Sequence, residues 1–136
     1  MYEKSFQLEI ITPQKVLFRG DASSLSGPGV QGGFQVLYNH APLLSALEIG
    51  RIKVKDANGN DIVFATSGGF VEVNNNHVVV LADTAERQDE IEIDRARAAK
   101  DRAMKRLRAR DERVDIARAQ AALARALNRI RVAQPG

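Results

Sequence analysis

Arginines recur in the last third of the chain at spacings that could gather their side chains into a site for an anion. They form two sets with the same spacing of seven and four residues: Arg95, Arg102 and Arg106, then Arg118, Arg125 and Arg129. At about 100° per residue, each set falls on one stripe of a helix. Paired guanidinium groups can bind phosphate oxygens, so the rows could serve a phosphorylated ligand. From geometry alone, a solvated helix face with short-range ion pairs such as Glu92 with Arg95 is the simpler interpretation.

Two histidines and two glycine pairs are the other residues that could carry chemistry. His40 and His77 have no second ligand at the spacing of a metal site. We predict that His40, within NHAPLL, is a structural hydrogen-bonding group in a loop. The glycine pairs at 32–33 and 68–69 lack the Lys-Ser/Thr of a phosphate-binding loop, which favours turns or bulges. Because no nucleophile stands in a plausible relation to a base, we do not expect enzymatic activity from this chain by itself.

The composition divides the chain near residue 85. Residues 1–84 carry six Lys/Arg and eight Asp/Glu, a net charge of −2, whereas residues 85–136 carry fourteen and nine, a net charge of +5. Nine of the ten glycines lie in the first segment, and the stretch between Ala85 and Gln134 has neither Gly nor Pro. Ala, Arg, Leu and Glu dominate this stretch, which is typical of uninterrupted helix. We therefore predict two domains, 1–84 and 85–136.

The first domain has the patterns of short strands. The stretch FQLEI (6–10) alternates apolar and polar residues, and the apolar run HVVVL (77–81) fits a strand inside a sheet. Asn58-Gly59 predicts a two-residue hairpin turn because both residues tolerate positive φ, and the asparagines at 74–76 predict another turn. About eight to ten such strands predict an antiparallel β-sandwich or flattened barrel.

The second domain has the pattern of a helical hairpin, from about Glu90 to Arg110 and from about Asp115 to Val132. Asp111 or Asp115 could cap the second helix. Each helix has one apolar stripe, and the residues of these stripes are Ala96, Ala99, Ala103 and Leu107, then Ile116, Leu123, Leu127 and Ile130. The stripes are thin, so this domain should be weakly held and should need a partner surface or ligand. The expected fold class is α+β, a sandwich followed by an antiparallel two-helix hairpin.

Composition also excludes several classes of protein. Without cysteine there are no disulfides or thiolate metal sites. No segment reaches the roughly 20 apolar residues of a membrane span, and the N-terminus lacks the order of a signal peptide, so we expect a soluble or peripheral protein. The basic residues are interleaved with acidic ones, which disfavours a dedicated nucleic-acid-binding tail.

Three stretches of the sequence together resemble one family. They are GGFVEV (68–73) followed by VVVLADTAER (78–87), the loop ending NHAPLL (39–44) before EIGRIKV (48–54), and the closing DIARAQAALARALNRIRV (115–132). Taken in their order along the chain, and over essentially the full length, they resemble the epsilon subunit of the bacterial F-type ATP synthase. The chain departs from the family in GGFQVLYNHAPL (32–43), where Gly33, Gln35 and Asn39 replace the usual acidic residue and two glycines.

This resemblance implies a non-catalytic rotor subunit in the central stalk of a proton-translocating ATP synthase. It implies a sandwich that binds the gamma subunit and the c-ring of the membrane sector, with the 32–43 loop region facing that ring. The hairpin would lie folded or extend along gamma to the catalytic alpha and beta subunits, where its basic residues inhibit ATP hydrolysis. The implied location is peripheral, on the cytoplasmic face of the bacterial plasma membrane. No cofactor is required, and nucleic acid is not an expected partner.

Some members of the family bind a regulatory ATP on the folded hairpin, through the pattern Ile/Leu-Asp-x-x-Arg-Ala with an upstream Glu and further arginines. Laid on this chain without a gap, the pattern and its additions fall on Glu86, Ile91, Glu92, Arg95, Ala96, Arg102, Arg125 and Arg129. Glu92 stands where Asp is usual. The stretch IDRARA (93–98) also fits the short pattern but breaks the match that follows. Four guanidiniums on two helices can neutralise a triphosphate, so the resemblance implies an ATP site at these eight residues.

The alternative from another class is a sandwich with a basic hairpin that regulates a soluble partner or binds nucleic acid through its arginine rows. Salt-dependent binding to RNA or DNA would favour this alternative. Co-purification with a gamma-like coiled coil would exclude it.

Overall fold

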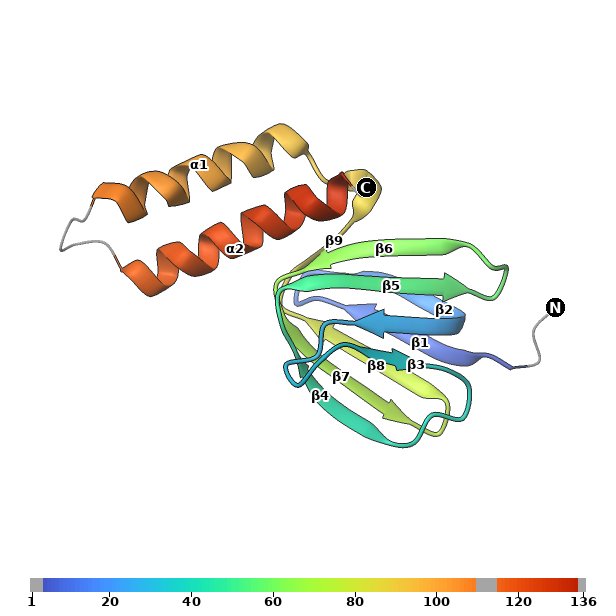
Figure 1. The fold of residues 1–136 in the computed structure, drawn as a ribbon. Helices are drawn as coiled ribbons and strands as arrows, with labels where there is room; N and C mark the ends of the chain where they lie inside the picture. Colours follow the sequence, from blue (N-terminus) through green and yellow to red (C-terminus); the bar gives the residue numbers. More distant parts are fainter. Residues whose placement is uncertain (1–3, 110–114, 135–136) are drawn as a thin grey trace. The chain divides into compact units, whose positions relative to one another are not determined.

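The computed structural model describes residues 4–109 and 115–134. The chain forms two compact units, Met1–Gln88 and Asp89–Gly136 (Figure 1). The change in composition at residue 85 falls just before the last strand of the first unit, which pairs with an earlier strand of the sheet. Because this strand belongs to the sheet, the first unit extends beyond residue 85, where the composition becomes typical of helix.

Within the described residues, the first unit is a nine-stranded sheet folded into a sandwich. The strands are β1 (Phe6–Ile11), β2 (Val16–Gly27), β3 (Phe34–Val36), β4 (Leu43–Leu47), β5 (Gly50–Asp56), β6 (Asp61–Thr66), β7 (Gly69–Asn74), β8 (His77–Ala82) and β9 (Ala85–Arg87). They follow the order β4-β7-β8-β1-β2-β5-β6-β9, and β3 pairs with β2 off this path. The predicted sandwich and its number of strands are confirmed.

One strand pair departs from the predicted antiparallel sheet. β1 and β8 run parallel, with Leu8 beside Val78 and Ile10 beside Val80. Parallel neighbours need a long connection, and here the whole segment from β2 to β7 provides it. The run HVVVL nevertheless lies inside the sheet as predicted, because β8 has β7 on one side and β1 on the other.

β2 carries the sheet from one layer to the other. Its first half pairs with β1 and its second half with β5, and the change occurs at Ala22. Alternate side chains of these strands point between the layers, where Leu8, Ile10 and Val54 are 0% exposed. The buried residues of this core lie between Phe6 and Ala82, so the first unit has a hydrophobic core of its own.

The two-residue turn with positive φ joins β7 to β8. Asn75 and Asn76 occupy it with φ of 50° and 59°, and Asn74 pairs with His77 across it. Both central residues of such a turn need positive φ, and Asn tolerates this conformation. The predicted turn at 74–76 is confirmed.

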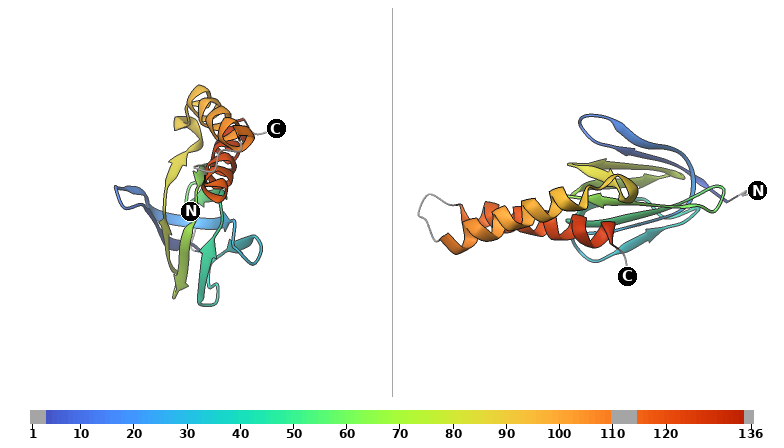
Figure 2. Two further views of the ribbon diagram at one scale, coloured as in Figure 1. Left: turned by 90° about the vertical axis from the view of Figure 1, so that its left-hand side faces the viewer. Right: turned by 90° about the horizontal axis from the view of Figure 1, so that it is seen from above.

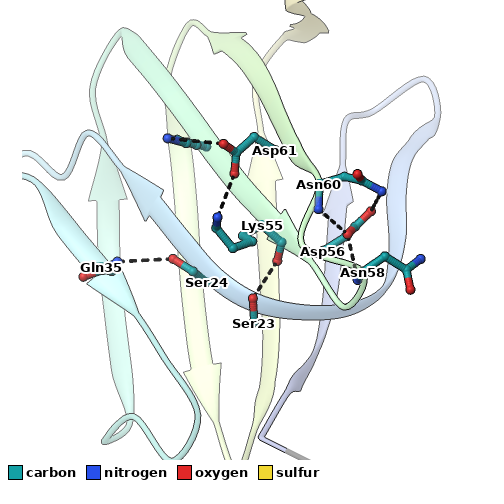
Figure 3. Close-up of polar contacts among 9 residues, drawn as sticks. Ser23, Ser24, Gln35, Lys55, Asp56, Asn58, Asn60 and Asp61 are labelled. Carbon is teal, nitrogen blue, oxygen red and sulfur yellow. Dashed lines mark hydrogen bonds and ion pairs between the residues drawn. The ribbon is translucent and has the colours of Figure 1, made fainter. Parts of the chain in front are cut away.

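The turn between β5 and β6 is longer than the predicted two-residue turn at Asn58-Gly59. Gly59 has a φ of 85°, and its amide donates to the Asp56 carbonyl at 3.0 Å. The Asp56 carboxylate accepts the amides of Asn58 and Asn60, each at 2.9 Å (Figure 3). The prediction was wrong because this carboxylate fixes a longer turn that ends in a glycine with positive φ.

The second unit consists of two antiparallel helices, α1 (Ile93–Ala109) and α2 (Ile116–Ala133), which pack side by side (Figure 2). A short 3-10 helix, Gln88–Glu90, precedes α1, so the α-helix begins three residues after the predicted start. Neither of the two described helices is long and apolar enough to cross a membrane. The predicted hairpin is confirmed.

The start of α2 follows the predicted capping. α2 begins after Asp115, whose carboxylate accepts the Arg118 amide at 3.1 Å. The other candidate cap, Asp111, and the predicted end of the first helix at Arg110 lie outside the described residues.

Candidate functional site

The two helices of the hairpin meet at small side chains. Ala96 and Ala103 of α1, and Ala119 and Ala126 of α2, are the most buried alanines of the hairpin, each at most 2% exposed. Each pair is seven residues apart and therefore lies on one stripe of its helix. Alanines on both sides let the helices approach closely, and we call these four residues the alanine seam. The seam confirms the predicted stripe of α1 at Ala96 and Ala103.

The predicted apolar stripe of α2 is wrong at two of its four positions. Ile116 is 60% exposed and Leu127 is 40% exposed, whereas Leu123 and Ile130 are half-buried. The alanine seam of α2 sets the direction that faces α1, and Leu127 is turned by about 100° from Ala126. Ile116 occupies the first turn of α2, at the end of the contact.

The two arginine rows lie on the same side of the hairpin. Arg95 and Arg102 each precede a seam alanine of α1, and Arg118 and Arg125 each precede a seam alanine of α2. Two antiparallel helices are related by a two-fold axis perpendicular to the plane that contains both helix axes. Residues that stand in the same position relative to a seam alanine therefore point to the same side of that plane on both helices. The third arginine of each row follows a seam alanine by three residues and lies on that side too. The hairpin thus has one arginine side, which carries all six.

Burial distinguishes the two placements of the ATP-binding pattern. In the gapless placement the Ile and Ala positions fall on Ile91 and Ala96, which are 9% and 0% exposed. In the placement on IDRARA they fall on Ile93, which is half-buried, and Ala98, which is exposed. The apolar positions of a helix motif are expected to face the interior, so the structure favours the gapless placement.

Seven of the eight predicted ATP-site residues belong to the second unit. The exposed ones are Glu92, Arg95, Arg102 and Arg125, and the half-buried one is Arg129. The structure brings these four arginines to the arginine side, together with Arg106 and Arg118, which the pattern does not include. Glu86 belongs to the first unit, in β9 opposite Ala65 of β6. Within residues 4–109 and 115–134, no cluster of three or more His, Cys, Asp or Glu side chains could hold a metal ion.

Glu92 occupies the N-cap position of α1. Its carbonyl accepts the Ala96 amide at 3.1 Å, just as the Asp115 carbonyl accepts the Ala119 amide at 3.0 Å on α2. Asp is a preferred N-cap residue because its short side chain reaches back to the free amides of the first turn. Glu92 in place of Asp therefore changes the cap of the helix as well as one position of the ATP-binding pattern.

The two helices share a sequence pattern that the predicted site does not use. An acidic N-cap is followed by Ile, by Arg-Ala three and four positions after the cap, and by Arg-Ala again seven residues later. The pattern runs from Glu92 to Ala103 and from Asp115 to Ala126. This repeat was available in the sequence, and it would have placed Arg118 beside the predicted arginines.

A row of apolar side chains crosses the outer face of one layer of the sandwich. Strand register places side by side Ala46, Phe70, Leu81, Ile11 and Val16, on β4, β7, β8, β1 and β2. Phe70 is 55% exposed, Leu81 54% and Val16 44%. Single exposed apolar residues are ordinary, whereas these lie side by side across five strands, and we call them the outer apolar row. The sequence did not reveal it because the row depends on register between distant strands.

Charged side chains border the outer apolar row on the same face. Arg19 Nη2 lies 3.0 Å from Glu9 Oε2, and His77 Nε2 lies 3.5 Å from Glu9 Oε1. The hydrogen bond from Arg19, followed by that from His77, lowers the pKa of Glu9 below its ordinary value. The Glu9 carboxylate therefore stays ionised at neutral pH.

The residues before β4 that differ from the usual family residues fit their local structure. Asn39 has a φ of 62°, a conformation natural for the family's glycine that Asn also tolerates. Gln35 lies in β3, where its Nε2 donates to Ser24 Oγ at 3.2 Å (Figure 3). His40 Nδ1 lies 2.6 Å from the Ala41 carbonyl oxygen, which confirms the predicted hydrogen-bonding role.

Two family models match the chain in succession. The beta-sandwich domain of the ATP synthase delta/epsilon chain matches residues 5–88, and the long alpha-helix domain of the same chain matches residues 89–134. The border between these matches coincides with the border between the two units.

Similar proteins and structures agree with this match. The ATP synthase epsilon chain of Syntrophomonas wolfei is 46% identical over 110 residues, which are 81% of this chain and 80% of that one. The ATP synthase epsilon chain of Nitratidesulfovibrio vulgaris is 54% identical over 105 residues, 77% of this chain and 78% of that one. The Euglena gracilis mitochondrial ATP synthase contains a chain of the same fold, with a TM-score of 0.78 and 22% identity over 88% of this chain and 76% of that one. On its two domains, their order and these relatives, this chain belongs to the delta/epsilon family of ATP synthase subunits.

Proposed function

We propose that this chain is the epsilon-type rotor subunit of a proton-translocating ATP synthase. It links the gamma subunit to the c-ring and restrains ATP hydrolysis through its hairpin. The epsilon-chain relatives support the subunit, and the Euglena assembly, described as OSCP, F1 and c-ring, supports these surroundings. The chain would be peripheral, at the cytoplasmic face of the bacterial plasma membrane. The family assignment outweighs the alternative of a module for soluble partners or nucleic acid.

The outer apolar row carries the proposal for gamma. It spans five neighbouring strands, so it offers a flat surface held rigid by the backbone ladder beneath it. A partner that covers Phe70, Leu81 and Val16 removes apolar area from water at about 25 cal/mol per Å². The ionised border around Glu9 and Arg19 would orient that partner. A helical surface of the gamma subunit fits such a flat apolar face.

Charge placed in the outer apolar row tests this docking. We expect the paired substitution Phe70→Glu and Leu81→Glu to weaken gamma binding about 30-fold or more, because two anchors are replaced by charges that must be desolvated. Arg51→Glu is the control, since Arg51 is exposed on β5 of the other layer. Titration calorimetry with gamma measures both. Equal affinity of the paired variant and the wild-type chain would reject this surface.

The loop region of residues 32–43 would face the c-ring. Its exposed large apolar residues are Leu37 and Tyr38, at 50% and 40%. The support is the family resemblance together with this exposure, which a solvated loop does not require.

The arginine side of the hairpin would bind a regulatory ATP. Arg95 and Arg102 on α1, with Arg125 and Arg129 on α2, gather four guanidiniums on one side, and the buried Ile91 and Ala96 anchor the start of α1. Four such groups can neutralise a triphosphate through bidentate contacts. Because ATP would engage only the folded hairpin, it would raise the population of that non-inhibitory state by its difference in affinity between the two states.

Single alanine substitutions test the arginine side. Replacing Arg95, Arg102 or Arg125 should cost about 1.5–3 kcal/mol, or roughly ten- to a hundredfold in ATP affinity. Arg108 and Arg131 are matched controls, because they are exposed on the same helices but lie on the side away from the rows. Calorimetry should find affinity lost in the first group and kept in the second. Equal losses in both groups would mean that ATP senses only net charge.

Glu92 needs two substitutions to separate its roles. Glu92→Asp restores the usual residue of the pattern but also improves the cap of α1, whereas Glu92→Ser improves the cap without a carboxylate. If the carboxylate contacts the ligand, ATP should bind more tightly to Glu92→Asp than to Glu92→Ser. Equal affinities would assign the whole effect to the cap. The absence of binding heat with millimolar ATP for all variants would remove the site.

A further inference from the structure

A pair of asparagines joins the loop before β4 to the turn between β7 and β8. The backbone N–H of Asn39 donates to the side-chain Oδ1 of Asn76 at 2.6 Å, and the side-chain Nδ2 of Asn76 donates to Asn39 Oδ1 at 2.9 Å. The Asn76 carbonyl also accepts the Gln7 amide at 2.9 Å, at the start of β1. We call the two reciprocal bonds the asparagine clasp. Three segments that are distant in the sequence meet at this point.

Both residues of the asparagine clasp hold a backbone conformation that few residues tolerate. Asn39 has a φ of 62° and Asn76 a φ of 59°. Glycine would satisfy both backbones more readily, so the conformation alone does not require Asn. The side chains add what glycine cannot provide, which is a direct bond between the loop and the turn. Neighbouring Asn75 has a φ of 50° and stands in the same turn outside the clasp.

The asparagine clasp acts on the part of the loop that exposes apolar side chains. The His40 amide donates to the Leu37 carbonyl at 3.1 Å, so residues 37–40 form a tight turn with Asn39 as its third residue. Leu37 and Tyr38, which begin this turn, are 50% and 40% exposed. The clasp therefore holds this turn through Asn39, the residue that directly follows the exposed pair.

We propose that Asn39 and Asn76 are positioning residues that hold the Leu37–His40 turn in the form that docks on the c-ring. The proposal rests on the proposed function for its partner. An exposed turn that is already ordered loses less conformational freedom when it docks, so affinity rises without a further contact to the partner. The family resemblance places a glycine at position 39, whereas the Asn39 of this chain makes this bond.

Three glycine substitutions separate the effect of losing the side-chain hydrogen bonds from the effect of glycine on the backbone. Asn76→Gly removes both hydrogen bonds, and Asn39→Gly removes the one that its side chain accepts. Asn75→Gly is the control, because it introduces the same backbone freedom at a positive-φ position of the same turn without removing either bond. Hydrogen exchange of the full chain should show the amides of residues 38–40 exchanging about tenfold faster in Asn76→Gly and about threefold faster in Asn39→Gly. Asn75→Gly should match the wild-type chain. Equal exchange in all four proteins would overturn the clasp.

Binding to the ring tests the functional half separately. The gamma complex of each variant is titrated with detergent-solubilised c-ring, and affinity should fall in the same order, about tenfold and about threefold, with Asn75→Gly unchanged. The double variant Asn39→Gly with Asn76→Gly should bind no worse than Asn76→Gly, because the clasp is lost once. Faster exchange with unchanged affinity would overturn the positioning role. A wild-type complex that does not bind the ring would instead reject the proposed function.

Discussion

At the scale of single residues, short polar side chains determine the turns of the sandwich. The Asp56 carboxylate accepts two backbone amides and so converts a simple Asn-Gly turn into a longer one (Figure 3). Asn39 and Asn76 join two turns through their side chains. In each case a group of two or three atoms satisfies backbone donors that the sheet leaves free.

The Asp56 turn predicts a dependence of stability on pH. The backbone hydrogen bond from Asn60 is the largest cause that lowers the pKa of Asp56 below its ordinary value of 3.8. A carboxyl whose pKa is lowered by folding stabilises the protein above its unfolded pKa and loses this contribution as pH falls through the folded pKa. Asp56→Ala should therefore lower the urea midpoint at neutral pH, and its midpoint should approach that of the wild-type chain as the pH falls through the lowered pKa of Asp56. A difference between the two proteins that stays constant with pH would contradict this assignment.

Residue types predicted local backbone conformation better than they predicted hydrogen-bond partners. Positive φ at Asn75 and Asn76 could be expected from the sequence, because Asn tolerates this conformation. The bond between Asn39 and Asn76 could not, because it joins positions far apart in the sequence whose proximity depends on strand register. Asp56 was available as a turn residue, but the choice between its turn and the Asn-Gly turn depended on two competing hydrogen-bond patterns.

At the scale of elements, the alanine seam decides how the hairpin presents its arginines. Helical periodicity predicted both helices, and the seven-residue spacing of Ala96 and Ala103 predicted one face of α1. The leucines of α2 suggested a different face, because larger apolar residues are normally the better guide to a core. The structure places the small residues inside, and Leu127 remains 40% exposed.

A larger side chain in the alanine seam should open the hairpin. Ala126→Leu adds three carbons at a position that is 2% exposed, and we expect it to destabilise the hairpin by about 1–3 kcal/mol. Ala124→Leu is the matched control, because Ala124 is exposed on the same helix and the change should stay within about 0.5 kcal/mol. Hydrogen exchange of the α2 amides should accelerate in the first variant alone. Equal protection of the two variants would show that the seam does not hold the helices together.

At the scale of the whole molecule, the two units divide the work of a non-catalytic ATP synthase subunit. The first unit has its own hydrophobic core and includes β9, so a chain of residues 1–88 keeps every strand pair of the sheet. A chain cut at residue 84 would lose β9 and uncover the edge of β6. The composition predicted two units but not this border, because a three-residue strand carries no compositional signal. The outer apolar row was likewise hidden from the sequence, since five strands must align before it exists.

The rate of ATP hydrolysis by the reconstituted catalytic head with gamma tests the central claim most directly. It should be compared without this chain, with the full chain, and with residues 1–88 at saturating concentrations confirmed by binding to gamma. We predict that the full chain lowers the rate several-fold and that residues 1–88 bind equally well but leave the rate near that of the head alone, because inhibition resides in the hairpin. Equal inhibition by residues 1–88, or an unchanged rate with the full chain, would contradict this account.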